Sequence, residues 1–323
     1  MRKVIGIGET VLDIIFRDDS PIAALPGGST YNAMISLGRS GVDCTFISEV
    51  GDDRVGDRIV NFLQENGVDS QCVCRFRGTK SPLSLAFLND KNDAEYIFYK
   101  DHPNDQLDFE YPQISPDDIV LFGSFYAVNP VIRHQVSELL RRARQAGAII
   151  YYDVNFRPSH QNEVVKIRPQ LLENFEYADI VRGSNEDFHV LFGKDSADEV
   201  YNDELAFYCK TLIYTQGADP VEVRWCKNNS TRRQENDSTS SQQFPVASTN
   251  TVSTIGAGDN FNAGFIFGLI SEGISRHDIE QGLSAQQWSR LIKSAQAFSA
   301  DCCKDIYNYV SVEFGKERRE QTK

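Results

Sequence analysis

Small residues and one carboxylate gather in the stretch from Ser253 to Gly264, which reads Ser-Thr-Ile-Gly-Ala-Gly-Asp-Asn-Phe-Asn-Ala-Gly. The apolar spacing that follows predicts a helix beginning inside or just after Gly256, Ala257 and Gly258. A helix start leaves main-chain N–H groups unpaired and favours negative charge, and small residues let an anion approach those groups. The stretch therefore predicts a phosphate-binding turn.

Asp259 follows this turn directly. A carboxylate repels a phosphate, so binding alone does not account for it. A base that takes the proton from an attacking hydroxyl does belong beside a transferred phosphate. The alternative is a Gly-rich turn in which Asp259 is an acidic first-turn residue, favoured by the helix dipole.

The same stretch resembles the C-terminal signature of the ribokinase-like (PfkB) sugar kinases, D-T-T-G-A-G-D-x-F-x-A-G. The resemblance implies that Asp259 is the catalytic base and that the amides of residues 256–258 form an anion hole. Ser253 stands where the family usually has Asp, and Ile255 where it often has Thr. The family's monovalent-cation site lies close to that Asp, so we expect weak or no potassium activation.

A second candidate segment begins at residue 25 and reads Leu-Pro-Gly-Gly-Ser-Thr-Tyr-Asn-Ala. Gly27 and Gly28 allow the main chain to come close to a sugar, and the Asn32 amide can both donate to and accept from hydroxyls. The string resembles the family's N-terminal G-G-x-x-x-N signature, and the two signatures occur in the family's order. The alternative is a tight turn with Ser29 or Thr30 as a helix N-cap.

Asp13 lies within the apolar, strand-like run 11–16. A buried carboxylate must be hydrogen-bonded, and sugar hydroxyls are suitable donors; the family's early Asp has this role. The alternative is a solvent-facing position. Residues 96–101, Tyr-Ile-Phe-Tyr-Lys-Asp, with Asn104-Asp105, resemble a segment of the fructokinase branch, which implies that Tyr99 binds substrate.

Arg157 closes the string Asp-Val-Asn-Phe-Arg, which precedes Pro158. It resembles the D-x-N-x-R-P string of the fructokinase and 2-keto-3-deoxygluconate kinase branch. An Arg at a strand end can neutralise phosphate charge or hold a substrate carboxylate. A purely structural Arg is the alternative.

The nucleotide side is predicted from weaker signals. Asn185-Glu-Asp-Phe188 resembles the family's N-x-x-E motif, which organises magnesium and phosphate through water. Because Phe188 stands at the Glu position, Glu186 or Asp187 would have to substitute, and we place the metal contact at Glu186. The alternative is that Asn185 is a plain N-cap.

Two further segments are candidates for the nucleotide. Thr215-Gln-Gly217 resembles the family's T-x-G turn near the nucleotide phosphates and ribose. The run 295–300 offers small helical side chains, including Ala297, on which an adenine ring could pack. Ordinary helix packing is the alternative for that run.

Composition bounds the function classes. The chain has 323 residues and a net charge of −13, which argues against nucleic acid and anionic membranes as partners. Its seven cysteines lack zinc-type spacing, and an odd number fits free thiols in a reducing compartment. Neither a signal-peptide core nor an apolar run of about 20 residues is present. We expect a cytoplasmic protein.

Strand-like and helix-like segments alternate along the chain, which predicts an α/β fold with a mostly parallel sheet. With the resemblance, this gives a single ribokinase-like three-layer α/β/α domain over residues 1–323. A small β lid is expected at about 14–26 and 80–105. Residues 227–243 are expected to be a long polar loop of a hairpin, and the charged tail after Gly315 to be frayed.

The resemblance implies ATP-dependent phosphorylation of a sugar hydroxyl, with fructose as the favoured substrate. ATP phosphates in an acidic protein need a counter-charge, so we expect a requirement for Mg²⁺. A 2-keto-3-deoxygluconate or other sugar-acid kinase is the close alternative. A sugar- or nucleotide-binding protein with little kinase activity is the alternative from another class, motivated by Ser253 and Phe188. A homodimer through the lid strands is also expected.

Overall fold

The computed structural model describes residues 2–88, 94–100, 107–226, 239–248 and 251–321. The chain forms two compact units, which are described separately. Unit 1 comprises Met1–Pro112, Thr249–Phe267 and Ser294–Lys323, and unit 2 comprises Gln113–Ser248 and Gly268–Lys293. Residues 101–106 of the expected lid, with Asn104-Asp105, and residues 227–238 of the expected polar loop lie outside the described part of the chain.

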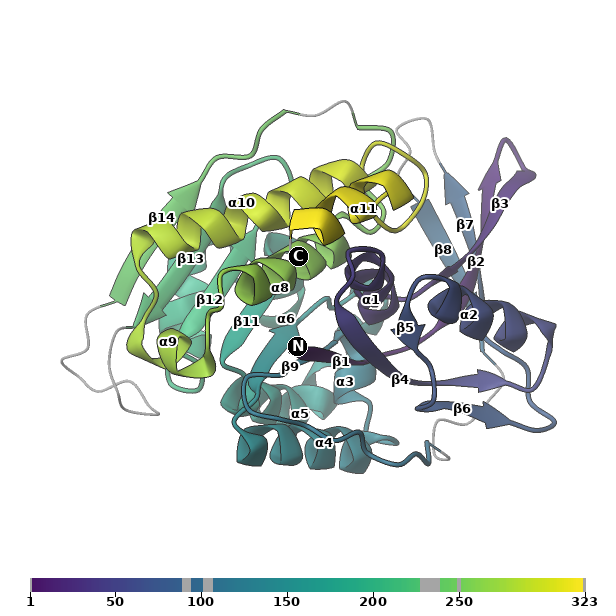
Figure 1. Ribbon diagram of the computed structural model, residues 1–323, viewed down its shortest axis with the longest axis horizontal. Helices are drawn as coiled ribbons and strands as arrows, with labels where there is room; N and C mark the ends of the chain where they lie inside the picture. The colour runs from purple at the N-terminus through teal and green to yellow at the C-terminus, as the bar shows by residue number, and fades with distance from the viewer. Residues whose placement is uncertain (1, 89–93, 101–106, 227–238, 249–250, 322–323) are drawn as a thin grey trace. The chain divides into compact units, whose positions relative to one another are not determined.

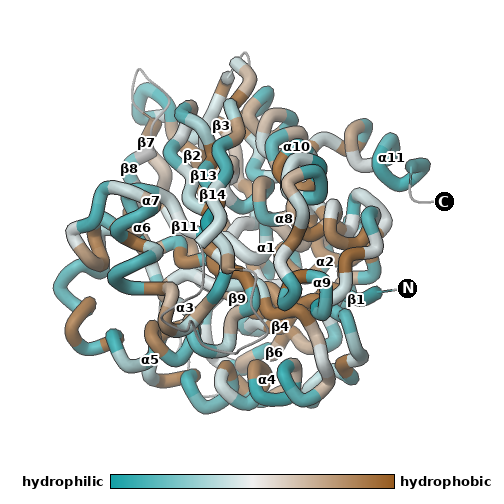
Figure 2. Tube along the Cα trace, turned by 90° about the vertical axis from the view of Figure 1, so that its left-hand side faces the viewer, coloured by the Kyte–Doolittle hydropathy of each residue, from teal (hydrophilic) through white to brown (hydrophobic). Residues whose placement is uncertain are grey.

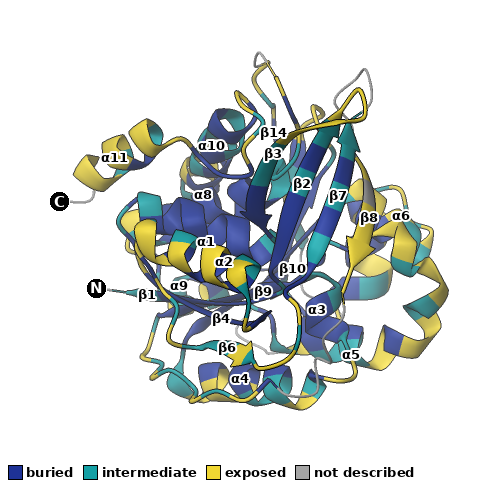
Figure 3. Cartoon of the chain, turned by 90° about the vertical axis from the view of Figure 1, so that its right-hand side faces the viewer, coloured by how far each residue is buried: buried dark blue, intermediate teal, exposed yellow. Residues whose placement is uncertain are grey.

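Unit 1 contains a small parallel sheet built on one central strand. That strand, β4 (Asp43–Gly51), pairs in parallel with β1 (Lys3–Ile7), β5 (Val68–Asp69) and β6 (Val73–Phe76). Two helices accompany it, α1 (Ser29–Arg39) and α2 (Arg54–Glu65). Most residues of α1 are buried, whereas α2 has one buried and one exposed face (Figure 3). Parallel strands whose faces are covered by helices are expected to carry apolar residues along most of their length.

A separate four-stranded sheet lies in unit 1, in the order β3-β2-β7-β8 (Figure 1). Its strands are β2 (Val11–Arg17), β3 (Ser20–Gly27), β7 (Leu83–Leu88) and β8 (Ala94–Tyr99). The β2–β3 hairpin turns at Asp18 and Asp19, both with positive φ, as its two-residue turn requires. These strands occupy the described parts of the two expected lid segments.

Unit 2 contains parallel strands in the order β12-β11-β10-β9, followed on the β12 side by two antiparallel strands. The strands are β9 (Ile119–Gly123), β10 (Ile149–Asp153), β11 (Ile180–Ser184), β12 (Thr211–Thr215), β13 (Val221–Cys226) and β14 (Thr239–Phe244). The β13–β14 pairing confirms the expected hairpin. Residues 239–243 belong to β14, however, so the expected loop is shorter than the polar composition suggested.

Helices alternate with these strands along the chain. In unit 2 they are α3 (Ser124–Val128), α4 (Arg133–Ala146), η2 (Pro158–Glu163), α5 (Val164–Tyr177), α6 (Asn185–Phe192), α7 (Ala197–Glu199), η3 (Val200–Leu205) and α9 (Arg276–Gln281). Two long helices, α8 (Ala257–Ser271) and α10 (Ala285–Cys302), have residues in both units. The α/β class with mostly parallel pairing is confirmed.

Residues 316–321 of the charged tail are helical, contrary to the expectation that the tail is frayed. Residues 312–321 form α11 (Val312–Gln321), which is largely hydrophilic (Figure 2). Its Gly315 packs closely on Arg39 of α1, and Arg319 donates to the carbonyl oxygens of Gly38 and Arg39 at 3.2 Å. Those carbonyls are at the C-terminal end of α1, where cations are favoured. Charge alone suggested fraying, but these contacts fix the helix.

Across the described residues, none of the helices combines the length and the apolar character that crossing a membrane would require.

Candidate active site

Asp259 lies in the first turn of α8 and is 8% exposed. Its Oδ1 accepts a hydrogen bond from Ser29 Oγ at 2.9 Å, and its Oδ2 accepts one from Asn32 Nδ2 at 2.8 Å. Ser29 and Asn32 both belong to α1, so the two sequence signatures meet at this carboxylate. The carboxylate thus accepts a hydrogen bond from a hydroxyl, the geometry that proton transfer from an alcohol to a general base requires.

The N-cap of α1 differs from the expected alternative. Gly28 is the N-cap, with a φ of 130°, and no side chain caps the helix. A Cβ on Gly28 would lie 2.1 Å from the carbonyl oxygen of Glu9, so only glycine fits there. Ser29 is the first helical residue, and its hydroxyl bonds Asp259 instead of the helix main chain.

The predicted anion hole is a tight turn before α8. Gly256 has a φ of 76°, and a Cβ there would lie 2.7 Å from the Asn308 carbonyl oxygen. The N–H of Ala257 donates to the Thr254 carbonyl oxygen at 3.1 Å, so the turn itself uses this amide. The N–H groups of Gly256 and Gly258 stay the predicted anion-binding groups of this turn. Ser253 accepts from the N–H of Ile255 at 3.2 Å and stabilises the same turn.

Asp13 is buried, with 7% of its surface exposed, rather than solvent-facing. Its Oδ1 accepts from Ser84 Oγ, and its Oδ2 accepts from Asn308 Nδ2 at 3.2 Å. A Cβ on Gly27 would lie 2.4 Å from Asp13 Oδ2. The glycine therefore leaves the space that this carboxylate occupies, which ties Gly27 to Asp13.

Two asparagines repeat one pattern in unit 1. Asn32 donates its amide to Asp259, and Asn308 donates its amide to Asp13. In both residues the amide oxygen, Oδ1, is buried and accepts no hydrogen bond from the described residues. A buried acceptor without a donor costs about 1–3 kcal/mol. Two carboxylates and two such oxygens make a region rich in acceptors, which suits a ligand with many hydroxyl groups.

Tyr99 does not share a sheet face with Asp13. The register pairs Asp13 with Ser84 and Ser84 with Phe98, so these three side chains point to one face. Tyr99 pairs with Leu83 and points to the other face, and it is 56% exposed. Phe98, 63% exposed, is the β8 residue in register with Ser84 and Asp13 on that face.

Lys100 follows β8 and pairs with Glu9. Its Nζ lies 2.8 Å from Glu9 Oε1, with the two side chains 30% and 43% exposed. The main chain of Glu9 also contacts Gly28. The positive charge at the end of β8 is therefore already matched by a carboxylate beside the paired glycines.

In unit 2, a buried ion pair joins the ends of three neighbouring strands. Arg182 of β11 donates to Asp153 Oδ1 of β10 at 3.0 Å and to Thr215 Oγ1 of β12 at 2.7 Å. Burial alone would lower the pKa of Arg182, but the charges of Asp153 and Asp187 outweigh it and the pKa is raised. The Thr215 hydroxyl, predicted at the nucleotide, thus also holds Arg182 in place.

The structure contradicts the alternative that Asn185 is a helix N-cap. The N-cap of α6 is Ser184, not Asn185, and it forms a capping box with Asp187. Asp187 is 6% exposed and accepts from the N–H groups of Ser184 and Phe156. Phe188 is fully buried and stacks on Tyr214, so its position belongs to the core.

The metal prediction rests on an exposed residue. Asn185 and Glu186 are both exposed in the first turn of α6. Among the described residues, no group of three or more His, Cys, Asp or Glu side chains could hold a metal ion. Glu186 is therefore accessible to a metal ion, and its contact with magnesium stays a prediction.

The remaining predicted residues are accessible. Arg157 is exposed at the start of η2 and forms no ion pair with the described part of the chain. Gly217 has a φ of 61° and open space around it, as a turn beside a nucleotide would need. Ala297 of α10, in unit 1, is half-buried. Contact of Gly217 and Ala297 with the nucleotide stays a prediction.

Comparison with known proteins identifies the family. The model of the pfkB family carbohydrate kinases matches residues 1–304. The chain belongs to the PfkB family. A crystal structure of fructokinase with bound ATP from Xylella fastidiosa has a TM-score of 0.79 at 20% identity and covers 99% of both chains. At that identity the likeness shows the shared fold.

Two curated relatives of this PfkB chain differ in substrate. Probable fructokinase-2 of Arabidopsis thaliana is 25% identical over 213 residues, which cover 61% of this chain and 63% of the relative. That match spans less than two thirds of the relative's length. The 5-dehydro-2-deoxygluconokinase of Geobacillus thermodenitrificans (strain NG80-2) is 28% identical over 260 residues, which cover 76% of this chain and 72% of the relative.

The sequence analysis did not predict the contacts of three residues of this PfkB chain. Ser29 contacts Asp259, Asn308 contacts Asp13, and Arg182 joins Asp153 to Thr215. Arg182 had a usable signal, because a charged residue interrupts the apolar run at 180–183. Ser29 was noticed only as a helix cap. No local pattern marks Asn308, because its partner is 295 residues away.

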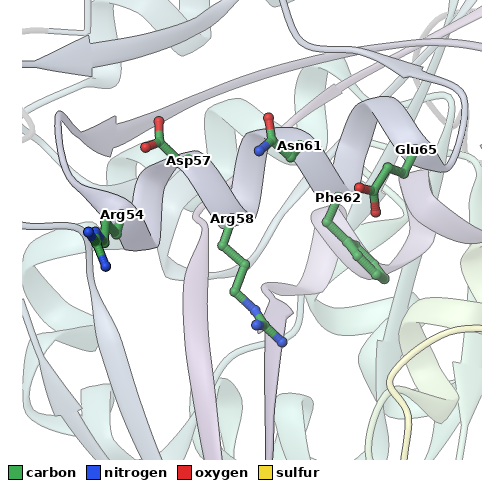
Figure 4. A pocket seen from close by; sticks show the side chains of 6 residues that line it. All are labelled: Arg54, Asp57, Arg58, Asn61, Phe62 and Glu65. Carbon is green, nitrogen blue, oxygen red and sulfur yellow. The ribbon is translucent and has the colours of Figure 1, made fainter.

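A surface hollow elsewhere in unit 1 holds none of these residues. Figure 4 shows it beside α2, lined by Arg54, Asp57, Arg58, Asn61, Phe62 and Glu65. All six come from one helix and mix both charges. Arg58 donates to the Ala24 carbonyl oxygen of β3 at 2.6 Å, so its structural role is to hold that strand.

Proposed function

We propose that this PfkB chain transfers the γ-phosphoryl group of ATP to a hydroxyl of a neutral sugar, most favourably fructose. One observation carries the proposal: Asp259 is buried beside the Gly256 turn and accepts hydrogen bonds from two residues of the paired-glycine signature. A base next to N–H groups that can bind an anion is the arrangement that phosphoryl transfer needs.

The chemistry assigns a role to each group. Asp259 takes the proton of the attacking sugar hydroxyl, and the sugar oxygen forms a bond to the γ-phosphorus. The bond between that phosphorus and the β-phosphate oxygen breaks, and ADP leaves. The N–H groups of Gly256 and Gly258 stabilise charge on the transferred group. A magnesium ion carried by ATP would neutralise phosphate charge.

The charge pattern of unit 1 favours a neutral sugar over a sugar acid. Asp13 and Asp259 accept hydrogen bonds, and the amide oxygens of Asn32 and Asn308 are further acceptors without a donor among the described residues. They suit hydroxyl donors and repel a carboxylate. Lys100, which directly follows β8, already forms an ion pair with Glu9. The negative charge of Glu9 weakens the attraction of Lys100 for the carboxylate of a sugar acid.

A sugar acid remains the second candidate substrate. Arg157 is exposed and without an ion pair among the described residues, so it is available to hold a substrate carboxylate. One curated relative is a 5-dehydro-2-deoxygluconokinase. A binding protein with little kinase activity is the third candidate, since Ser253 and Phe188 depart from the family's motifs.

An ADP-release assay with ATP and Mg²⁺ across a sugar panel tests the function. The panel contains fructose, other neutral hexoses, ribose, 2-keto-3-deoxygluconate and 5-dehydro-2-deoxygluconate. We expect fructose to give the highest kcat/KM. Preference for a sugar acid would replace the substrate and keep the chemistry. Binding of sugar without ADP release would support the binding-protein alternative.

We also propose a homodimer formed through the lid sheet. Ile97, Phe98 and Tyr99 of the edge strand β8 are 44%, 63% and 56% exposed, which is unusual for three consecutive apolar residues at a sheet edge. Light scattering after size-exclusion chromatography should give twice the chain mass. Phe98→Lys should shift it to the monomer, and Val165→Lys, at an exposed helix position, should not.

A further inference from the structure

Asn308 contacts both the predicted sugar-binding carboxylate, Asp13, and the predicted anion-binding turn at Gly256. It lies between α10 and α11 and is 2% exposed. Its side-chain amide donates to Asp13 Oδ2 at 3.2 Å. Its main-chain carbonyl oxygen accepts from Asn260 Nδ2 at 2.9 Å and lies against Gly256. One residue therefore touches the sugar-binding carboxylate and the anion-hole turn.

The orientation of the Asn308 amide follows from its neighbour. An ionised carboxylate only accepts hydrogen bonds, so the NH₂ group must face Asp13. The oxygen Oδ1 is then fixed on the other side, buried and without a donor among the described residues. A ligand hydroxyl is the group that would satisfy it. Asn32 has the same arrangement beside Asp259.

The surroundings keep this arrangement in place. Ser84 Oγ donates to the other oxygen of Asp13, so the carboxylate is held from two sides. A Cβ on Gly27 would come within 2.4 Å of Asp13 Oδ2 and 3.2 Å of Asn308 Nδ2. The Asn260 side chain also donates to the Gly256 carbonyl oxygen at 2.8 Å, which fixes the Asn308 main chain relative to the turn.

We propose that Asn308 is a sugar-positioning residue. Its amide N–H orients Asp13 toward the sugar hydroxyls, its Oδ1 accepts a hydroxyl of the bound sugar, and its main chain supports the Gly256 turn. The inference rests on the proposed sugar kinase function. Because the side chain serves the sugar and the main chain serves the turn, side-chain replacement changes sugar affinity and leaves phosphoryl transfer intact.

Two replacements at this position separate positioning from packing. Asn308→Ala removes the donor and the acceptor, and we expect it to raise the KM for the sugar about 10-fold. Asn308→Asp keeps the shape but places an acceptor against Asp13, and we expect a rise of about 100-fold or more. A merely structural role predicts a lower melting temperature in both variants with the sugar KM of the folded protein unchanged. The kcat and the KM for ATP should stay within about 2-fold.

A matched control lies one residue further on. Tyr309 donates its hydroxyl to the Pro26 carbonyl oxygen at 2.6 Å, so Tyr309→Phe loosens the same segment without touching Asp13. We expect it to lower the melting temperature and leave the sugar KM unchanged. Ser84→Ala removes the second donor to Asp13 and leaves the Asn308 segment intact. It should raise the sugar KM in the same direction as Asn308→Ala, which keeps the test valid if an Asn308 variant does not fold.

Sugar binding measured by calorimetry without ATP completes the test. Weaker binding in both Asn308 variants, with Asp worse than Ala, supports the inference. Unchanged sugar KM and affinity in folded Asn308 variants would overturn it, as would a loss of kcat alone. If the wild-type chain phosphorylates and binds no sugar of the panel, the proposed function fails instead, and that outcome is seen before any variant is made.

Discussion

Replacing Asp259 by asparagine tests the central chemical claim. The carboxylate is 8% exposed and accepts from Ser29 Oγ and Asn32 Nδ2. An asparagine can keep both contacts, because its Oδ1 can accept from Asn32 while its Nδ2 donates to the Ser29 hydroxyl oxygen. The side chain should stay in place, and only the ability to take a proton is lost.

The size of each effect follows from these contacts. Two charge-assisted hydrogen bonds become neutral, at a cost of roughly 1 kcal/mol each. Release from burying a charge offsets part of that cost, so we expect the free energy of unfolding to fall by less than about 2 kcal/mol. Loss of a general base should lower kcat by roughly 10²–10⁴-fold, which corresponds to about 2.7–5.4 kcal/mol of transition-state stabilisation.

The assay is ADP release at saturating fructose and ATP, with sugar affinity measured separately by calorimetry. The control is Ser29→Ala, which removes one hydrogen bond to the carboxylate and keeps the base, so kcat should fall by less than about 10-fold. Turnover of Asp259→Asn close to the wild-type value, with sugar affinity preserved, would refute the assignment of the base. Equal losses in both variants would show that geometry, not proton transfer, was affected.

Three further predictions concern ions, Arg157 and alkaline pH. Activity should require Mg²⁺, and exchange of sodium for potassium should change the rate little, because Ser253 lacks a carboxylate and accepts from the Ile255 N–H; a large rise with potassium would contradict this. Arg157→Ala should lower kcat for every sugar if Arg157 binds phosphate, but should raise only the KM of a sugar acid if it binds a carboxylate. Burial raises the pKa of the thiols of Cys44, Cys209 and Cys302 above 9.0. Above pH 9 the unfolded chain loses these protons and the folded chain keeps them. The free energy of unfolding should therefore fall by up to about 1.4 kcal/mol per pH unit for each thiol. Urea titrations at pH 8 and pH 10 measure this fall, and equal stability at the two pH values would count against the prediction.

The fold class and the positions of most strands were predictable because the signals are local. Apolar runs bounded by glycine, such as 119–123 and 149–153, must be buried, and the amphipathic spacing of 54–66 predicts a helix. The α11 helix was not predictable from its charge. It is stabilised by Gly315 packing on Arg39 and by Arg319 at the end of α1, which are partners far away in sequence.

Within two of the predicted motifs, the sequence did not determine which individual residues make the local contacts. Asn185 could have been an N-cap by its residue type, but the capping box of α6 is formed by Ser184 and Asp187. Tyr99 was chosen from the resemblance of residues 96–101 to a segment of the fructokinase branch. Only the pairing register of β7 and β8 decides that Phe98 shares a face with Asp13, because a shift of one residue reverses the face of every side chain.

The sequence by itself determined which residue types could do the chemistry: a carboxylate after a small-residue turn, and paired glycines before an asparagine. Each depends on residues that are adjacent in the chain, so spacing alone carries the information. The tertiary structure decided how those groups are held. The bonds from Ser29 and Asn32 to Asp259, and from Asn308 to Asp13, join residues 227 to 295 positions apart. Such contacts form only when the chain folds, because their donors and acceptors carry no mark of each other in sequence.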